Sequence, residues 1–247
     1  MKHINTKDAR RFFNSATDQA MLIIDVFDEI GASMFCEGIT AGMISDALAE
    51  GKDCSSVTLN INSPGGDLFE GVAAFNVIKA CGKPVNVNII GLCASAASLI
   101  ACAGDKVTMC PGSTYMIHEA QAVCMGYSSD MKKMADVLDT VTASAADLYT
   151  AKTGQKKEDI LKLMAAETWM SPEEAVAGKF ADAIGAGDKS ITNVFDLAKF
   201  KNTPEALRNA VKVEQVDEEV VVEVEKSAEV VDYSLQMKRV ELERKRF

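Results

Sequence analysis

Apolar residues recur with two different spacings along most of the chain, and the two spacings follow one another in turn. Strict alternation of apolar and polar residues over 57–61 and 85–89 predicts two β-strands, and a run over 21–27 that is apolar except for Asp25 predicts another. Apolar residues at helical spacing over 38–50, ended by Gly51, predict a helix. The first half of the chain is therefore expected to consist of strand–helix units.

The same alternation continues in the second half. Apolar residues keep helical spacing over 128–152 and Gly154 follows, which predicts one long helix. Ser171, Pro172 and Glu174 form the start signal of a shorter helix, with a serine cap and a glutamate three residues later. The remaining expected elements are helices over 67–80 and 157–165 and strands over 106–110, 114–118 and 180–184. Strands that alternate with helices predict a layered α/β fold.

The amino-acid composition changes near residue 187. Residues 214–232 are rich in acids and valines, with Lys226 as their single base, and the last residues of the chain are basic. Such a segment has little apolar surface to bury. We therefore expect an N-terminal arm over 1–19, one domain over 20–187, and a partly disordered tail over 188–247 that serves as a scaffold or recruitment segment.

Composition excludes several classes of protein. The formal net charge is −10, whereas nucleic-acid-binding surfaces are normally basic. The seven cysteines contain no Cys-x-x-Cys pair, so we expect free thiols in a reducing compartment and no metal site. The uncharged stretch over 84–104 is broken at Gly91, which favours a strand and a buried helix over a membrane span. Charged residues near the N-terminus fit no signal peptide, so we expect a soluble cytoplasmic protein without membrane partners.

Candidate chemistry follows the ends of three predicted strands. A Gly65-Gly66 turn follows the first, Ser95 the second and His118 the third. The chain has only two histidines, and His3 lies in a polar N-terminal stretch. Each feature has an ordinary alternative: a strand-to-helix turn, a helix-capping serine and a core histidine. Ligands of layered α/β sheets gather at the carboxyl ends of strands, and a serine becomes nucleophilic beside a base, which together favour a serine hydrolase.

Three motifs together resemble one known family. Asn62-Ser63-Pro64-Gly65-Gly66, Gly91-x-x-Ala94-Ser95 and Met116-Ile117-His118 resemble the proteolytic subunit of the Clp protease, peptidase family S14. The segments 28–31, 62–67, 94–98 and 167–175 add a resemblance to the phage-type branch, the head or capsid maturation proteases. The resemblance covers about residues 20–187. It implies a ClpP/crotonase-like layered fold of repeated strand–helix units, with the helix over 128–152 as a protruding handle.

The resemblance also implies roles for single residues. Ser95 corresponds to the nucleophile and His118 to the general base, and the backbone N–H groups of Gly65, Gly66 and Ala96 correspond to the oxyanion hole. Where the housekeeping enzyme has an aspartate as third catalytic residue, this chain has Glu167. Asp139 and Asp182 are the reserve acids for that role. Residues 119–122 depart from the proline and glycines that the family uses to bind substrate. No cofactor is expected.

The expected function is that of a serine endopeptidase that processes capsid or scaffold proteins during phage head maturation, in the host cytoplasm or the procapsid. A homo-oligomeric ring and protein substrates are the expected partners, with an unfoldase partner left open. An apolar stripe on the helix over 128–152 is expected to pack between subunits, or alternatively onto its own domain. Two other functions stay open: a crotonase-type acyl-CoA enzyme, which also uses paired backbone amides, and a non-catalytic assembly scaffold.

Overall fold

The computed structural model describes residues 2–3, 13–18, 20–31, 38–185, 195, 197, 199–205 and 207. These residues belong to one compact unit, Met1–Val213, and the second unit, Glu214–Phe247, lies outside the described residues. The acidic and basic parts of the expected tail therefore receive no structural description. Among the described residues, no helix is long and apolar enough to cross a bilayer.

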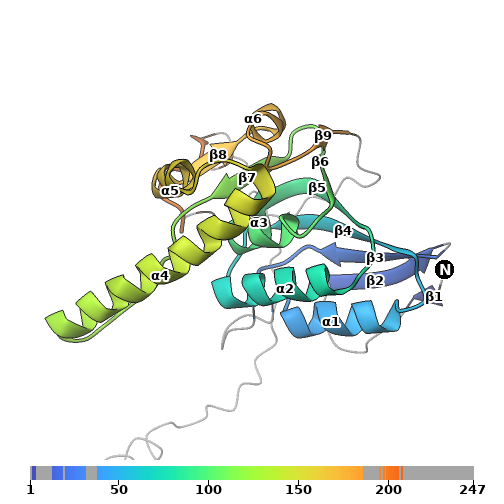
Figure 1. The fold of residues 1–247 in the computed structure, drawn as a ribbon, viewed down its shortest axis with the longest axis horizontal. Coiled ribbons are helices and arrows are strands. Elements are labelled where there is room, and N and C mark those ends of the chain that lie inside the picture. The colour runs from blue at the N-terminus through green and yellow to red at the C-terminus, as the bar shows by residue number, and fades with distance from the viewer. Residues whose placement is uncertain are drawn as a thin grey trace, which may run out of the picture. The chain divides into compact units, whose positions relative to one another are not determined.

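The nine described strands form one sheet, and its centre is parallel (Figure 1). Along the sheet the order is β1 (Lys2–His3), β2 (Phe13–Asp18), β3 (Met21–Val26), β4 (Ser56–Ser63), β5 (Val85–Ala94), β6 (Lys106–Met109) and β9 (Ala183–Ile184). The strands β3, β4, β5 and β6 pair in parallel, whereas β2 is antiparallel to β3. The predicted α/β fold is confirmed, and residues set aside as an N-terminal arm supply two strands of its sheet.

Strand β5 has two neighbours on the same side, one at each of its ends. Its first half pairs with β6, and residues 92–94 pair with β7 (Thr114–Ile117). Strand β8 (Thr168–Met170) then adds to β7 in the antiparallel direction. This branching brings the carboxyl ends of β5 and β7 together. Those two ends are directly followed by Ser95 and His118, the predicted candidate residues.

The helices lie where the sequence predicts them. They are α1 (Ala41–Glu50), α2 (Leu68–Ala80), α3 (Ala96–Ala101), α4 (Ser128–Thr153), α5 (Lys157–Ala165) and α6 (Pro172–Ala177). The predicted capping box of α6 is present, with Ser171 Oγ accepting from Glu174 N. In Figure 1, α1 and α2 lie side by side over β2, β3 and β4, and the N-terminal half of α4 extends away from the sheet. The predicted handle helix is therefore confirmed.

The core lies between the sheet and the helices α1, α2 and α3. Alternate residues of the central strands point into it and are fully buried: Leu22, Ile24, Leu59, Ile61, Val87 and Ile89. They meet Ile44 of α1, Ile78 of α2 and Leu99 of α3 in one cluster. Each such buried side chain contributes about 1.5–3 kcal/mol relative to exposure. At Gly71 an added Cβ would lie 3.0 Å from Ala96, so a small residue lets α2 approach the start of α3 closely.

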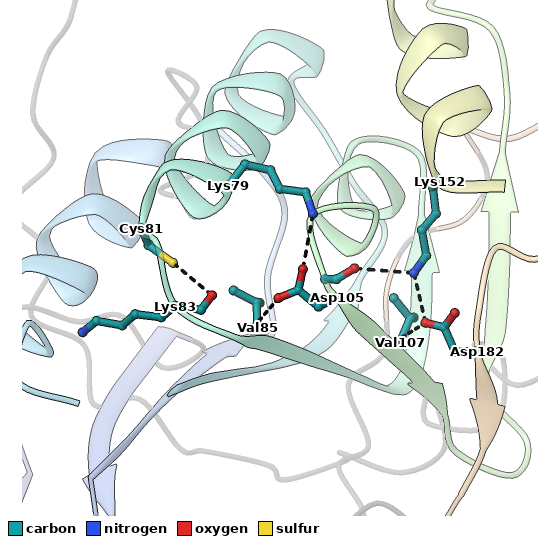
Figure 2. A network of polar contacts seen from close by, with 9 residues as sticks. Lys79, Cys81, Lys83, Val85, Asp105, Val107, Lys152 and Asp182 are labelled. Carbon is teal, nitrogen blue, oxygen red and sulfur yellow. Dashed lines mark hydrogen bonds and ion pairs between the residues drawn. The ribbon is translucent and has the colours of Figure 1, made fainter. Parts of the chain in front are cut away.

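Polar contacts hold the amino ends of β5 and β6 (Figure 2). The carboxylate of Asp105 accepts from Val85 N at 2.9 Å and pairs with Lys79. The carboxylate of Asp182 accepts from Val107 N at 2.7 Å and pairs with Lys152 of α4 at 3.0 Å. These contacts fix the end of the sheet that is remote from Ser95, which follows the carboxyl end of β5. They also join the C-terminal end of α4 to the sheet.

A segment beyond the expected domain boundary packs against the sheet. We call the described residues 195, 197, 199–205 and 207 the strap. Its apolar residues form a second cluster with residues of β5, β7 and β8, namely Leu92, Ala94, Met116, Trp169, Phe195, Leu197, Phe200 and Leu207. Leu197 and Phe200 are buried in it. The compact unit therefore extends past residue 187, where the sequence analysis placed the boundary.

Candidate active site

Ser95 occupies a sharp turn between β5 and α3. Its backbone has φ 55° and ψ −126°, a conformation rarely adopted by residues other than glycine. Its amide donates to Met116 O at 3.0 Å, which fixes the turn against β7. Although Ser95 stands at the cap position of α3, its side chain forms no capping hydrogen bond. The helix-capping alternative is therefore wrong, and the hydroxyl is available for another partner.

That partner is His118. The distance between Ser95 Oγ and His118 Nε2 is 2.7 Å. The pKa of His118 lies below its ordinary value, chiefly because burial penalises the imidazolium; the charge of Glu167 opposes this shift, and Lys199 and Lys201 reinforce it. The imidazole is therefore neutral at pH 7 and can accept the hydroxyl proton. A serine and a neutral imidazole in this geometry form an activated nucleophile.

The Gly65-Gly66 turn lies directly beside Ser95. Ile30 N donates to Gly65 O at 2.9 Å, and Asp67 N donates to Ile30 O at 2.8 Å, so the turn is bound on both sides of Gly66. An added Cβ at Gly65 would lie 2.7 Å from the Ser95 Cβ, which only glycine avoids. The turn is thus held in contact with the candidate nucleophile.

The three amides expected in the oxyanion hole differ in their partners. Gly65 N donates to Ser63 Oγ at 3.2 Å, within the turn itself. Neither of the two bonds between the turn and Ile30 uses the N–H of Gly66. Ala96 is the first residue of α3, where helix amides lack a carbonyl partner one turn earlier. Gly66 and Ala96 also line the same cavity as Ser95, so these two amides are the better placed donors.

A cavity of about 380 Å³ opens beside Ser95 and His118. Its wall consists mainly of apolar residues from α2, α3 and α4, namely Leu68, Phe69, Leu99, Met134, Val137, Leu138, Val141 and Ala145. Residues 119–122, directly after His118, line its edge. Part of the apolar stripe of α4 therefore faces this cavity. The cavity suits an apolar side chain of a bound peptide.

Glu167 lies near His118 but does not bond to it. It is 8% exposed, and its carboxylate accepts from Trp169 Nε1 at 3.2 Å, Lys201 N at 2.9 Å and Asn202 N at 2.5 Å. Among the hydrogen bonds between described residues, none joins Glu167 to His118. Its influence on the imidazole is electrostatic. The two reserve acids are placed elsewhere: Asp139 is exposed on α4, and Asp182 binds Val107 N.

Sequence reasoning missed the strap at this site. The ring of Phe200 meets the His118 ring edge to face, with centroids 5.5 Å apart, and meets Trp169 in the same way at 5.5 Å. Two strap amides bind Glu167. The signal present in the sequence is the spacing of three apolar residues, Phe195, Leu197 and Phe200, which precede the acidic run over 214–232.

Comparison with known proteins gives the family. The model of the Clp protease family matches residues 16–188 of this chain. The chain belongs to the Clp protease family. The matched region contains Ser95, His118, Glu167 and the glycine turn, and it ends before the strap. Together with the relatives described next, this match identifies a serine-type peptidase.

Individual relatives agree with this assignment. The chain is 32% identical over 136 residues to an ATP-dependent Clp protease proteolytic subunit of Pleurastrum terricola, covering 54% of this chain and 69% of that protein. It is 31% identical over 138 residues to proteolytic subunit 2 of Thermobifida fusca, covering 55% and 68%. The solved structure of a ClpP1 mutant from Listeria monocytogenes superimposes with a TM-score of 0.58 at 24% identity, over 68% of this chain and 92% of that one. This superposition supports the ClpP-like fold.

Proposed function

We propose that this chain is a serine endopeptidase that cleaves capsid or scaffold proteins during phage head maturation. One observation carries the chemistry: Ser95 Oγ lies 2.7 Å from His118 Nε2, beside the amides of Gly66 and Ala96 and an apolar cavity. The phage role rests on the resemblance of residues 28–31, 62–67, 94–98 and 167–175 to the phage-type branch. The host cytoplasm or the procapsid is then the place of action.

The proposed reaction begins when Ser95 Oγ attacks the scissile carbonyl carbon of a bound peptide. His118 Nε2 takes the hydroxyl proton as the new C–O bond forms, and the carbonyl oxygen becomes an oxyanion. The N–H groups of Gly66 and Ala96 donate to this oxyanion; in other enzymes one such donor is worth about 10²–10³ in kcat. When the C–N bond breaks, His118 gives its proton to the leaving amine. The product is an ester between Ser95 and the acyl half of the substrate.

The second half of the reaction releases that ester. His118 takes a proton from water, and the resulting hydroxide attacks the acyl carbon. The same two amides bind the second oxyanion. When it collapses, the bond between the acyl carbon and Ser95 Oγ breaks, and His118 gives its proton to Ser95 Oγ. In this proposal the carboxylate of Glu167 stabilises the imidazolium that forms in each half, through its charge.

The substrate is proposed to bind as an extended segment along residues 119–122, with one apolar side chain in the cavity. Residues 119–122 form no strand of their own and line the cavity edge, and Glu119, Gln121 and Ala122 are exposed. The N–H of Ala120 donates to Thr142 Oγ1 at 3.0 Å, so the peptide is proposed to pair with the other backbone groups of this segment. The cavity wall from α4 then sets the preference for an apolar residue next to the scissile bond.

A homo-oligomeric ring is the proposed assembly. Large apolar residues are exposed at the N-terminal end of α4 and just before it, where Val123, Met125 and Tyr127 are each more than four-fifths exposed. Exposed apolar surface of this kind marks an interaction site. Sedimentation of the full-length protein tests this, since charged substitutions at Met125 and Tyr127 should give smaller species.

Co-expression with the neighbouring capsid protein tests the function. The wild type should shorten the capsid protein at a defined site, as read by mass spectrometry, and Ser95→Ala should leave it intact. A fluorophosphonate probe should label Ser95 in the wild type. Absence of labelling would contradict a serine peptidase. It would instead favour the two alternative functions, a crotonase-type acyl-CoA enzyme or a non-catalytic scaffold. Labelling without capsid cleavage would retain the peptidase and overturn only the proposed substrate.

A further inference from the structure

We propose that the strap completes the catalytic site from outside the substrate cavity, with Phe200 and the amides of Lys201 and Asn202 as positioning groups for His118 and Glu167. The inference rests on the proposed peptidase function. The region that matches the Clp protease family ends at residue 188, so the strap lies outside the matched region. No described strap residue lines the cavity, so the strap leaves the proposed peptide path open.

The first observation concerns the carboxylate of Glu167. A carboxylate that is 8% exposed needs hydrogen-bond donors in place of water. Trp169 supplies one donor, and the consecutive amides of Lys201 and Asn202 supply one to each carboxylate oxygen. The side chain of Asn202 also donates to Ala166 O at 2.9 Å, beside Glu167 in the chain. The strap therefore fixes where the negative charge near His118 lies.

The second observation concerns the imidazole. Phe200 is 4% exposed. The plane of its ring makes an angle of 90° with the His118 ring and of 81° with the Trp169 ring. Edge-to-face pairs of this kind are worth about 0.5–1.5 kcal/mol beyond the buried area. Because Trp169 also donates to Glu167, Phe200 links the histidine to the residue that binds the carboxylate. Displacing Phe200 would expose the imidazole to water, and the ring would no longer be held in one orientation.

The strap has contacts of its own that hold this arrangement. Phe200 N donates to Leu197 O at 3.1 Å, and Thr203 Oγ1 donates to the same oxygen at 3.2 Å. Lys199 pairs with Glu29 at 3.0 Å; this partly exposed pair contributes little stability, but it ties the strap to the loop before α1. Leu197 and Phe200 bury their side chains in the same apolar cluster. The strap is thus anchored on both sides of the residues that touch the site.

The strap adds charged and apolar groups around His118, and both kinds of group affect the pKa of its imidazole. Glu167 faces the imidazole with a negative charge, and the strap contributes the positive charges of Lys199 and Lys201. Burial, to which Phe200 contributes, outweighs the effect of Glu167 and lowers the pKa of His118. Removing the Phe200 ring should admit water and let the pKa of His118 rise towards its ordinary value.

Kinetics on the full-length protein test the positioning role. Phe200→Ala should lower kcat for a small peptide roughly 10- to 100-fold, since a misplaced catalytic group costs about that much, and should leave KM nearly unchanged. Phe200→Leu should recover part of the loss. The matched control is Leu197→Ala, which removes bulk from the same cluster but no aromatic contact to His118. In a Glu167→Gln background the penalty of Phe200→Ala should shrink, because the two groups act on one histidine.

Histidine NMR gives a readout that does not depend on activity. The chain has two histidines, so His3→Gln assigns the signals of His118 directly. Phe200→Ala should raise the pKa of His118, and Leu197→Ala should not. Equal rates and equal His118 titration in the wild type and Phe200→Ala would overturn the inference. If the wild type neither cleaves peptides nor reacts with a fluorophosphonate, the peptidase function fails, and the NMR titration alone decides whether the strap positions His118.

Discussion

The hydroxyl of Tyr149 on α4 lies 2.7 Å from Ser98 Oγ on α3. Ser98 Oγ also donates to Ser95 O at 2.5 Å, and Tyr115 OH donates to Ser98 O at 2.9 Å. Tyr149 is buried, and burial raises its pKa well above the ordinary value, so the hydroxyl stays neutral. Through Ser98, the handle helix is thereby hydrogen-bonded to the turn that carries Ser95.

Tyr149→Phe should lower stability with little effect on the chemistry. The change removes one partner of Ser98 Oγ, which still donates to Ser95 O, so the expected cost is about 0.5–1.5 kcal/mol. Thermal unfolding should show a lower Tm, while the rate of fluorophosphonate labelling at Ser95 stays within about twofold. A larger loss of labelling rate than of stability would show that Tyr149 also controls the conformation of Ser95.

Ser95→Ala should abolish peptide cleavage and leave the fold intact, because alanine fits a turn that is already flanked by Ala94 and Ala96. His118→Ala should have nearly the same effect, since the two side chains act as one unit. The double variant should be no slower than either single one. Steady-state kinetics with a small peptide measure this, and circular dichroism serves as the control for folding. Additive losses would mean that the two residues do not act in the same step.

The pH dependence follows from the lowered pKa of His118. Activity requires the neutral imidazole, so kcat/KM should rise with pH through a pKa below the ordinary value of 6.5 and be complete by neutral pH. The same shift affects folding. Between the folded-state pKa and 6.5 the unfolded chain binds more protons, so the stability that His118 confers falls as the pH drops through this window. A rise in kcat/KM centred above pH 7 would contradict the assignment.

The strands and helices of the core were predictable because their periodicity is strong, as in 57–61 and 85–89. Strand β2 was missed because its sequence, Phe13–Asp18, is mostly small and polar, and its pairing with β3 is a tertiary property. The proximity of Ser95 and His118 was predictable because both directly follow strands of one sheet and the chain has only one other histidine, His3. The hydrogen bond from Gly65 N to Ser63 Oγ, which occupies one of the amides expected in the oxyanion hole, could not be inferred from spacing alone.

The strap was missed for a different reason. Taken together, residues 188–247 are dominated by charge, because the acidic run over 214–232 outweighs the few apolar residues before it. Leu197 and Phe200 nevertheless bury their side chains against β5 and β7. Composition averaged over a long segment therefore concealed a short one that packs beside His118.

Two shortened chains separate the strap from the residues that follow it. A chain ending at Val213 keeps the strap and the whole first compact unit, so it should cleave a small peptide as fast as the full-length protein. A chain ending at Gly187 loses Phe200 and the two amides that bind Glu167, so its kcat should fall at least about tenfold. Residues 214–247 should matter only for recruitment, since their charge favours contact with a partner, and efficient capsid cleavage on co-expression should need them.

Circular dichroism checks that both shortened chains fold. Full activity of the folded chain ending at Gly187 would make the strap dispensable, and loss of peptide cleavage already at Val213 would give the residues after it a part in the chemistry.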